Sequence, residues 1–179
     1  MSTTPFAILG LLSFEPMSGY DIRRNLDESL SHFWSESYGQ IYPSLRRLET
    51  DGLIAPVKQT AAGSRRKRSF TLTPRGRAKL RSWLAEAPKP QPPRNELMLK
   101  IFFGRLAPPG AVTAHLRRLQ VQQERFLATL ESIERQLRIE RAGHPDLRYW
   151  LLTLKAGVER GKALLDWSDD ALADLKGAP

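Results

Sequence analysis

The chain has 179 residues, 41% of them hydrophobic, which is enough for one compact domain or for a small domain with a helical extension. It has no cysteine, which excludes disulfides and thiolate chemistry. The apolar N-terminal segment has no basic residues before it and is interrupted by Glu15, so we expect neither a signal peptide nor a membrane span there. The net charge of +9 equals that of residues 58–81 alone, which hold nine basic residues and no acidic one. This patch favours a polyanionic partner, with a solvated basic surface as the alternative.

Three helical patterns fill the first 52 residues. Residues 4–13 form an apolar helix that opens with a proline just inside a threonine cap. Ser18 is a cap for a second helix over 19–30, whose expected buried face comprises Tyr20, Ile22, Leu26 and Leu30. A third helix, with Ile41, Leu45 and Leu48 on its apolar face, runs from Tyr38 to Asp51 and closes at Gly52, where glycine suits the left-handed position.

Pro43 conflicts with the helical pattern around it, because proline removes a backbone donor and disfavours helix in the preceding residue. We expect a tightened or bent first turn there; absorption of the proline without a bend is the alternative.

After Gly52 the spacing of apolar residues changes from that of a helix to that of β-strands. Residues 53–59 and 66–73 are strand-like, with a small polar tip at 60–64 and with Ile54, Val57, Phe70 and Leu72 as the expected inward residues. Thr73 and Pro74 then open a helix over 74–86. The order of three helices, a hairpin and a helix predicts a winged helix-turn-helix domain, mainly α with a small β-hairpin wing, over residues 1–87.

A proline-rich linker at 88–95 separates this domain from a wholly helical one at 96–179. Closely spaced apolar residues predict that 96–104 is buried around most of its circumference. The long helix at 108–141 and the last helix alternate apolar steps of four and three, the pattern of a coiled-coil seam. We expect this α-helical domain to dimerise through Leu116, Leu119, Gln123, Phe126, Leu130, Ile133, Leu137, Leu151, Leu154 and Val158. Gly157 and Gly161 would allow another helix to approach closely.

No enzymatic site can be assembled from the sequence. The three histidines lie in three separate segments without the spacing of metal ligands, and no glycine-rich phosphate loop or nucleophile elbow is present. Carboxylates of the long helix alternate with arginines, as on a solvated face. We therefore expect no catalysis, no cofactor and no metal.

The third helix and the hairpin offer groups that suit DNA. The second helix of a helix-turn-helix enters the major groove, where a glutamine can pair with adenine and arginines bind phosphates. The expected DNA contacts are Ser37, Tyr38, Gln40, Tyr42, Ser44, Arg46 and Arg47 on the helix and Arg65, Arg66, Lys67 and Arg68 on the wing. An interhelical position is the alternative for Tyr42, and capping or solvation for Ser37 and Gln40. Strand alternation prevents all four wing cations from facing one phosphate row.

Three segments, ILGLLSFEPMSGYDI, GQIYPSLRRLETDGLI and RKRSFTLTPRGRAKL, together resemble the PadR family of bacterial transcriptional regulators. The resemblance covers the N-terminal domain, and the C-terminal half resembles the members with a long helical dimerisation domain. It implies a cytoplasmic, nucleoid-associated homodimer that binds double-stranded operator DNA with dyad symmetry, usually as a repressor, and makes no membrane contact. The recognition-helix start then falls on Ser37, Tyr38, Gln40 and Tyr42, and the basic wing on residues 65–68.

Many members of the family are released from DNA by a small molecule, and phenolic acids serve for the founding group. An aromatic effector lodged between the domains would lie near Trp34, Trp83, Trp150 or Trp167, for each of which ordinary core packing is the alternative. A repressor without an inducer fits the sequence equally well. Two other functions also fit: a winged-helix module that binds an acidic protein, and a non-specific nucleic-acid binder.

Overall fold

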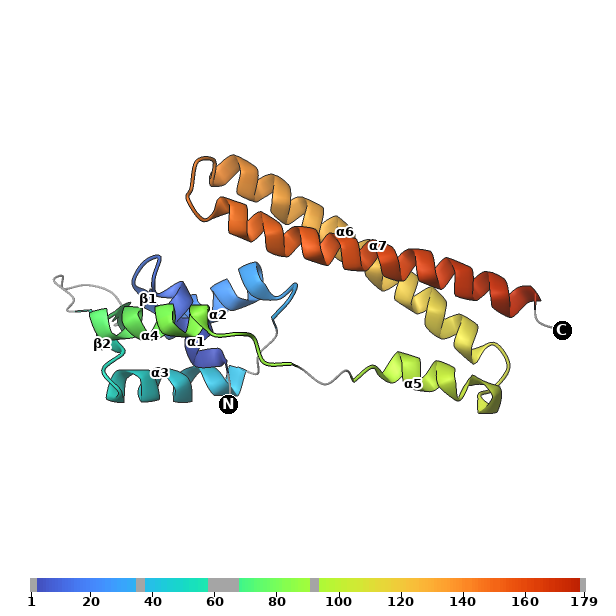
Figure 1. Cartoon of the computed structure of the whole chain (residues 1–179), viewed down its shortest axis with the longest axis horizontal. Coiled ribbons are helices and arrows are strands. Elements are labelled where there is room, and N and C mark those ends of the chain that lie inside the picture. Colours follow the sequence, from blue (N-terminus) through green and yellow to red (C-terminus); the bar gives the residue numbers. More distant parts are fainter. Residues whose placement is uncertain (1–2, 35–37, 58–67, 91–93, 178–179) are drawn as a thin grey trace. The chain divides into compact units, whose positions relative to one another are not determined.

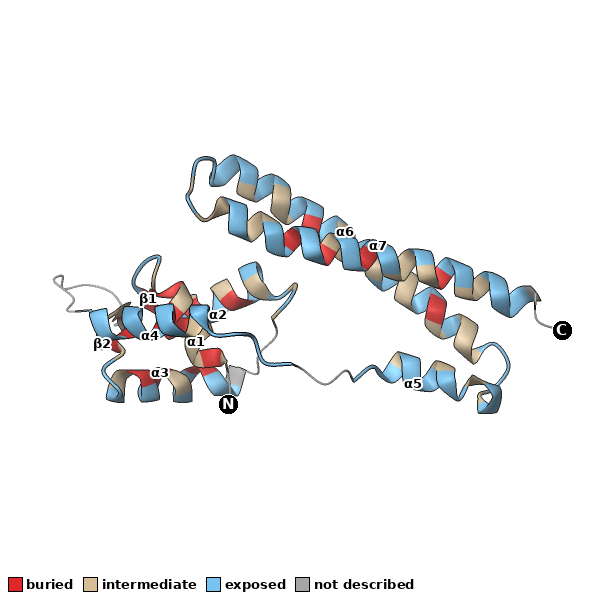
Figure 2. Ribbon diagram, viewed as in Figure 1, coloured by how far each residue is buried: buried red, intermediate tan, exposed pale blue. Residues whose placement is uncertain are grey.

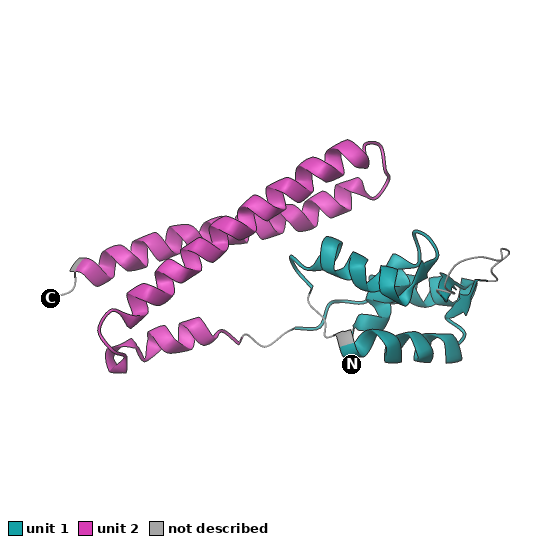
Figure 3. Ribbon diagram, turned by 180° about the vertical axis from the view of Figure 1, so that it is seen from behind, with its two compact units in different colours: residues 1–90 teal, residues 91–179 magenta. Residues whose placement is uncertain are grey.

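The structure, a computed structural model, describes residues 3–34, 38–57, 68–90 and 94–177. The chain forms two compact units, residues 1–90 and residues 91–179, coloured separately in Figure 3. Each unit contains several helices of its own.

The N-terminal unit combines helices with a small antiparallel sheet (Figure 1). Its elements are α1 (Thr4–Leu11), β1 (Met17–Ser18), α2 (Gly19–Asn25) continued by a π-helical turn (Leu26–Leu30), a 3₁₀ turn (Tyr38–Gln40), α3 (Ile41–Thr50), β2 (Ile54–Pro56), β3 (Ser69–Leu72) and α4 (Pro74–Ala85). The predicted order of three helices, a hairpin and a helix is thus confirmed.

The sheet has the strand order β1-β3-β2, with both pairs antiparallel. In β3, Phe70 is opposite Met17 of β1 and also opposite Pro56 of β2, while Leu72 is opposite Ile54. The sequence predicted the β2–β3 hairpin but assigned no strand to Met17 and Ser18. Two residues are too few to show the alternation of a strand, so β1 is defined by its pairing with β3.

The core of this unit lies where α1, α2, α3, α4 and the sheet meet. Its buried residues are Ile8, Leu9, Leu11, Leu12, Met17, Ile22, Leu26, Ile41, Leu45, Leu48, Ile54, Phe70 and Leu80. Two expectations are wrong: Tyr20 and Val57 are 55% and 38% exposed. Tyr20 is two helical positions from Ile22, about 200° around the axis, and Val57 is an odd number of strand positions from Ile54, so each faces away from the core.

Helix ends follow the predicted chemistry at three of four places. The Ser18 hydroxyl accepts a bond from the Asp21 amide, and the Asp21 carboxylate accepts one in return from the Ser18 amide. Thr73 caps α4 by accepting from the Gly76 amide at 3.0 Å, and Gly52 has a φ of 68° at the end of α3. At α1 the cap residue is Thr3, whose side chain makes no capping bond, and Pro5 occupies the second helical position.

The C-terminal unit comprises α5 (Glu96–Phe102), a 3₁₀ turn (Gly104–Leu106), α6 (Ala111–Glu140) and α7 (Leu147–Gly177). The two long helices lie side by side as a hairpin (Figure 1). Their seam holds the heptad residues that the sequence singled out: Leu116, Leu130 and Leu154 are at most 1% exposed, and Leu119, Gln123, Phe126, Ile133, Leu137, Leu151 and Val158 are half-buried. The buried residues therefore line the inside of a single-chain hairpin (Figure 2).

The predicted close approach of a helix to the glycines of α7 is confirmed. A Cβ on Gly157 would lie 2.9 Å from Leu130 Cδ1, and one on Gly161 would lie 2.8 Å from Leu127 Cδ2. Both neighbouring leucines belong to α6, so α7 lets α6 approach at these two points.

The expectation of burial for residues 96–104 is wrong within the single chain. No residue of α5 is buried; Leu99 and Phe102 are 60% and 81% exposed, and the same exposure continues through Phe103 and Leu106 (Figure 2). A helix of seven residues that packs on α6 with one side leaves its other side uncovered. None of the helices in the described residues has an apolar stretch long enough to cross a membrane.

Candidate nucleic-acid interface

Helix α3 separates the residues that hold the core from those that face solvent. Ile41, Leu45 and Leu48 are at most 3% exposed and point into the unit. Tyr42, Arg46 and Arg47 lie on the opposite side and are exposed, as is Gln40 in the preceding turn, whereas Ser44 is half-buried. One face of this helix is thus free to contact a partner.

The start of α3 accommodates Pro43 without losing a helical hydrogen bond. The chain enters through the 3₁₀ turn Tyr38–Gln40, and Pro43 is the third residue of α3, where a backbone N–H has no acceptor within the helix. A tightened 3₁₀ turn is therefore present, directly before the first residue of α3 and with two residues between it and the proline. It places Gln40 at the junction of the two helical segments, with its side chain exposed.

Tyr42 combines the two roles that the sequence left open. A Cβ on Gly19 would lie 2.8 Å from Tyr42 Cε1, so the ring packs on the first residue of α2. The side chain is nevertheless 54% exposed. The ring therefore braces α2 against α3 and still presents part of its surface to solvent.

The arginines of α3 differ in their partners. Arg47 lies 3.8 Å from Asp51 in an exposed ion pair one turn along the helix. Arg46 has no acidic partner within 4.0 Å among the described residues. Exposed pairs of this kind contribute about 0–1 kcal/mol, so both cations remain available to phosphate.

Four of the predicted DNA contacts, Ser37, Arg65, Arg66 and Lys67, lie outside the described residues, and of Tyr38 the backbone alone is described. The fourth wing cation, Arg68, precedes β3 and forms an ion pair with Glu49 of α3. Its guanidinium carbon also lies 5.3 Å from the centre of the Phe70 ring. Arg68 thus pairs with α3, although its side chain is still 64% exposed.

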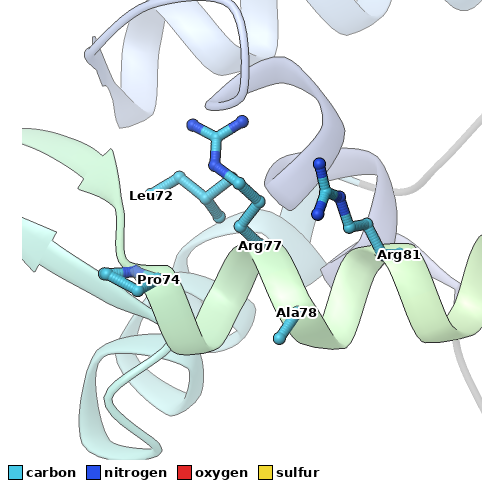
Figure 4. Close-up of a pocket in the computed structure, with 5 residues that line it drawn as sticks. All are labelled: Leu72, Pro74, Arg77, Ala78 and Arg81. Carbon is cyan, nitrogen blue, oxygen red and sulfur yellow. The ribbon is translucent and has the colours of Figure 1, made fainter.

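A second group of cations lies on α4; the sequence placed them in the basic patch of residues 58–81 but not among the individual DNA contacts. Arg75, Arg77, Lys79 and Arg81 are all exposed, and no acidic residue occurs between 58 and 81. Arg77 and Arg81 rise from the same side of α4 beside Leu72 and line a surface depression with it (Figure 4). The absence of acidic residues from this segment was the signal that could have marked α4 as well as the wing.

Two of the four tryptophans stack on another ring of their own unit. Trp83 stacks on Phe6 of α1 with ring centres 4.5 Å apart, and Trp150 stacks on His144 at 4.7 Å. Trp167 is half-buried, and the indole N–H of Trp34 is buried without an acceptor among the described residues. Trp83 therefore packs as an ordinary core residue within the N-terminal unit. Among the described residues, no group of histidines and carboxylates could hold a metal ion.

These features define a winged helix-turn-helix protein with a helical C-terminal unit. The family model described as the transcriptional regulator PadR-like family matches residues 8–82, and that described as virulence activator alpha C-term matches residues 93–176. The negative transcriptional regulator PadR of Bacillus subtilis is 32% identical, over 97% of each chain. The chain belongs to the PadR-like family of transcriptional regulators.

Two solved structures are similar over nearly the whole chain. The crystal structure of Bacillus subtilis PadR in complex with operator DNA has a TM-score of 0.82 and 30% identity, covering 96% of this chain and 98% of that one. The crystal structure of the same protein in complex with p-coumaric acid has a TM-score of 0.78 and 30% identity, covering 98% and 99%.

Proposed function

We propose that this protein is a sequence-specific DNA-binding regulator of transcription that acts as a repressor. The observation that carries the proposal is the outward face of α3 and the turn before it, where Gln40, Tyr42, Arg46 and Arg47 are exposed. A glutamine can bond an adenine edge bidentately, and arginines can bond guanine edges or phosphates. The nine basic residues of 58–81 supply the non-specific attraction that brings phosphate to this face.

The similarity to Bacillus subtilis PadR supports this function. The match to its structure with operator DNA extends over 98% of the Bacillus subtilis chain. The two proteins are therefore similar over their whole length, and not in the winged-helix unit alone. We extend the proposal to Ser37, Tyr38, Ser44 and residues 65–67 as further DNA contacts. On this basis the protein works in the bacterial cytoplasm, on the nucleoid, and without catalysis.

We further propose that the protein acts as a homodimer. Leu116, Leu130 and Leu154 are sealed inside the hairpin of one chain, so they add no area to an interface and act by holding α6 and α7 together. The exposed apolar side chains of α5 and the following turn, Leu99, Phe102, Phe103 and Leu106, form a surface of the kind that other protein covers. A second copy of the chain is the partner, and two recognition helices about 34 Å apart would then read the two halves of a dyad operator.

A small aromatic acid is the proposed effector. The support is the similarity to Bacillus subtilis PadR, which has been crystallised with p-coumaric acid. Of the four tryptophans, Trp34 carries a buried indole donor without an acceptor among the described residues. Titration with p-coumaric acid should quench tryptophan fluorescence and weaken operator binding. In a Trp34→Phe variant, p-coumaric acid should still weaken operator binding, but the quenching should be smaller.

The decisive experiment compares binding to two labelled duplexes over a range of salt concentrations. One carries the dyad sequence from the protein's own promoter region, and the other is a random sequence of equal length. Preference for the dyad that persists at high salt supports a specific regulator. Equal salt-sensitive binding to both duplexes would identify a non-specific nucleic-acid binder, and binding to neither would favour a protein-binding module.

A further inference from the structure

Among the described residues, one charged pair links the start of β3 to α3, the proposed recognition helix. Arg68, next to the first residue of β3, donates from Nη2 to Oε1 of Glu49 near the end of α3, and the two residues are 19 positions apart in the chain. Arg68 also lies over Phe70, which is 7% exposed and belongs to the core. The guanidinium therefore contacts both a carboxylate and an aromatic ring, while the Arg68 side chain stays 64% exposed.

Glu49 occupies a position that its own helix does not favour. It is the ninth of the ten residues of α3, close to the helix C-terminus, where the macrodipole disfavours a negative charge. Its side chain is 27% exposed, so the carboxylate is more shielded than those of the ion-paired Glu28 and Asp51. The bond to Arg68 offsets the unfavourable interaction of the Glu49 charge with the helix C-terminus. It also links α3 to the start of β3.

The same two residues are part of the lining of a surface groove between α2, α3 and β3. Tyr42 and Arg46, which are proposed DNA contacts, line this groove together with Glu49 and Arg68. Movement of β3 away from α3 would therefore break the ion pair and open the groove beside the residues that read DNA.

We propose that Glu49 and Arg68 form a positioning pair that fixes the wing at a set distance from the recognition helix, and that Arg68 is not a phosphate contact. This inference rests on the proposed DNA-binding function. A wing held in place lets the helix and the wing engage together only on DNA whose groove fits both. A released wing still attracts phosphate on any sequence, so loss of the pair lowers discrimination more than total affinity.

The test uses the full-length protein and the two duplexes described above. Glu49→Ala and Arg68→Ala should each lower the preference for the dyad by about threefold to tenfold, as expected for one coupled pair. Their effects should not add in the double variant. Glu49→Ala should also steepen the salt dependence on random DNA, since the released Arg68 can join a phosphate, whereas Arg68→Ala should leave that slope unchanged. The exchanged pair Glu49→Arg with Arg68→Glu should restore the preference.

A matched control pair lies on the preceding helix. Arg24 and Glu28 form an exposed ion pair of 3.7 Å, and their alanine variants should leave the preference unchanged. Hydrogen exchange without DNA gives an independent measurement: the amides of β3 should exchange faster in Glu49→Ala and Arg68→Ala, but not in the control variants.

The outcomes separate this inference from the proposed function. A fall in the salt slope of about 0.9 for Arg68→Ala, with unchanged exchange in β3, would make Arg68 a phosphate contact and overturn the positioning role. Unchanged exchange and preference in Glu49→Ala would overturn it as well. If the unmodified protein showed no preference for the dyad duplex, the proposed function would be overturned. Faster exchange of the β3 amides in the two variants would still support the role of the Glu49–Arg68 pair in holding β3 against α3.

Discussion

The backbone of Gly76 in α4 lies directly against the carbonyl group of Leu53 at the entry to β2. A Cβ at position 76 would be 2.0 Å from that carbonyl oxygen and 2.8 Å from Leu72 Cδ1. Because the nearest atom belongs to backbone, a side chain here must displace the strand or the helix. The N-terminal unit depends on this contact, since α4 contributes Leu80 to the core that α3 also packs on.

Gly76→Ala should therefore destabilise the N-terminal unit by about 3 kcal/mol or more, despite the better helix propensity of alanine. Urea unfolding followed by circular dichroism measures the loss, and hydrogen exchange should localise it to residues 3–90. Gly10→Ala is the matched control, because nothing lies within 4 Å of a Cβ at that helical position. The control should gain about 0.5 kcal/mol; equal effects of the two substitutions would contradict the packing argument.

Thr73 joins α4 to the end of α3, the proposed DNA-reading helix. Its hydroxyl lies 2.8 Å and 3.0 Å from the carbonyl oxygens of Gly52 and Leu53, and it accepts from the Gly76 amide. Thr73→Val removes these bonds while keeping the shape, and it should cost about 1–2 kcal/mol of the free energy of unfolding. Thr3→Val, at a cap without a side-chain bond, should cost less than about 0.5 kcal/mol in the same urea titration.

The sequence predicted the N-terminal unit well because its elements carry local signals. Ser18, Thr73 and Gly52 mark helix ends by chemistry that acts within a few residues, and Ile41, Leu45 and Leu48 mark a buried face by their spacing. The errors arose where the face assigned to a residue did not match the period of its element, as at Tyr20 and Val57, or where an element depends on a distant partner, as β1 does.

The C-terminal unit shows a different limit. A heptad pattern gives the face of a helix that is buried, but it does not state whether the covering helix comes from the same chain. Here residues 141–146 reverse the chain, so α6 and α7 cover each other's seams. For the candidate site, residue types on α3 predicted its exposed face, whereas the pairing of Arg68 with Glu49 depends on a contact across 19 positions and left no local signal.

Gly157 should tolerate no branched side chain. A Cβ there would already meet Leu130, which is 0% exposed and cannot move away without opening the seam. Gly157→Val should cost about 2–3 kcal/mol in thermal or urea unfolding. Ala156→Val, at the adjacent exposed position, should cost about 0.5 kcal/mol from helix propensity alone. Similar losses in both variants would place α6 elsewhere.

The exposed apolar surface of α5 should control self-association. Phe102→Glu puts a charge on a side chain that is 81% exposed in the single chain but covered in the proposed dimer. Sedimentation should then show a dissociation constant raised at least about tenfold, with the helical content unchanged. Leu84→Glu makes the same change at a leucine that is 67% exposed on α4 and should leave association unaltered. An unmodified protein that sediments as a monomer at micromolar concentration would refute the dimer.

Gln40 and Arg46 should affect DNA binding in different ways. Gln40→Ala removes a group that can read a base edge, so preference for the dyad should fall by about 1–3 kcal/mol while binding to random DNA stays the same. Arg46→Gln removes a cation that reaches phosphate, so both duplexes should bind more weakly and the salt slope should fall by about 0.9. Arg24→Gln removes an exposed arginine of α2 outside the proposed interface and should change neither quantity. If Gln40→Ala and Arg46→Gln both left the two affinities unchanged, the exposed face of α3 would not be the DNA-reading surface.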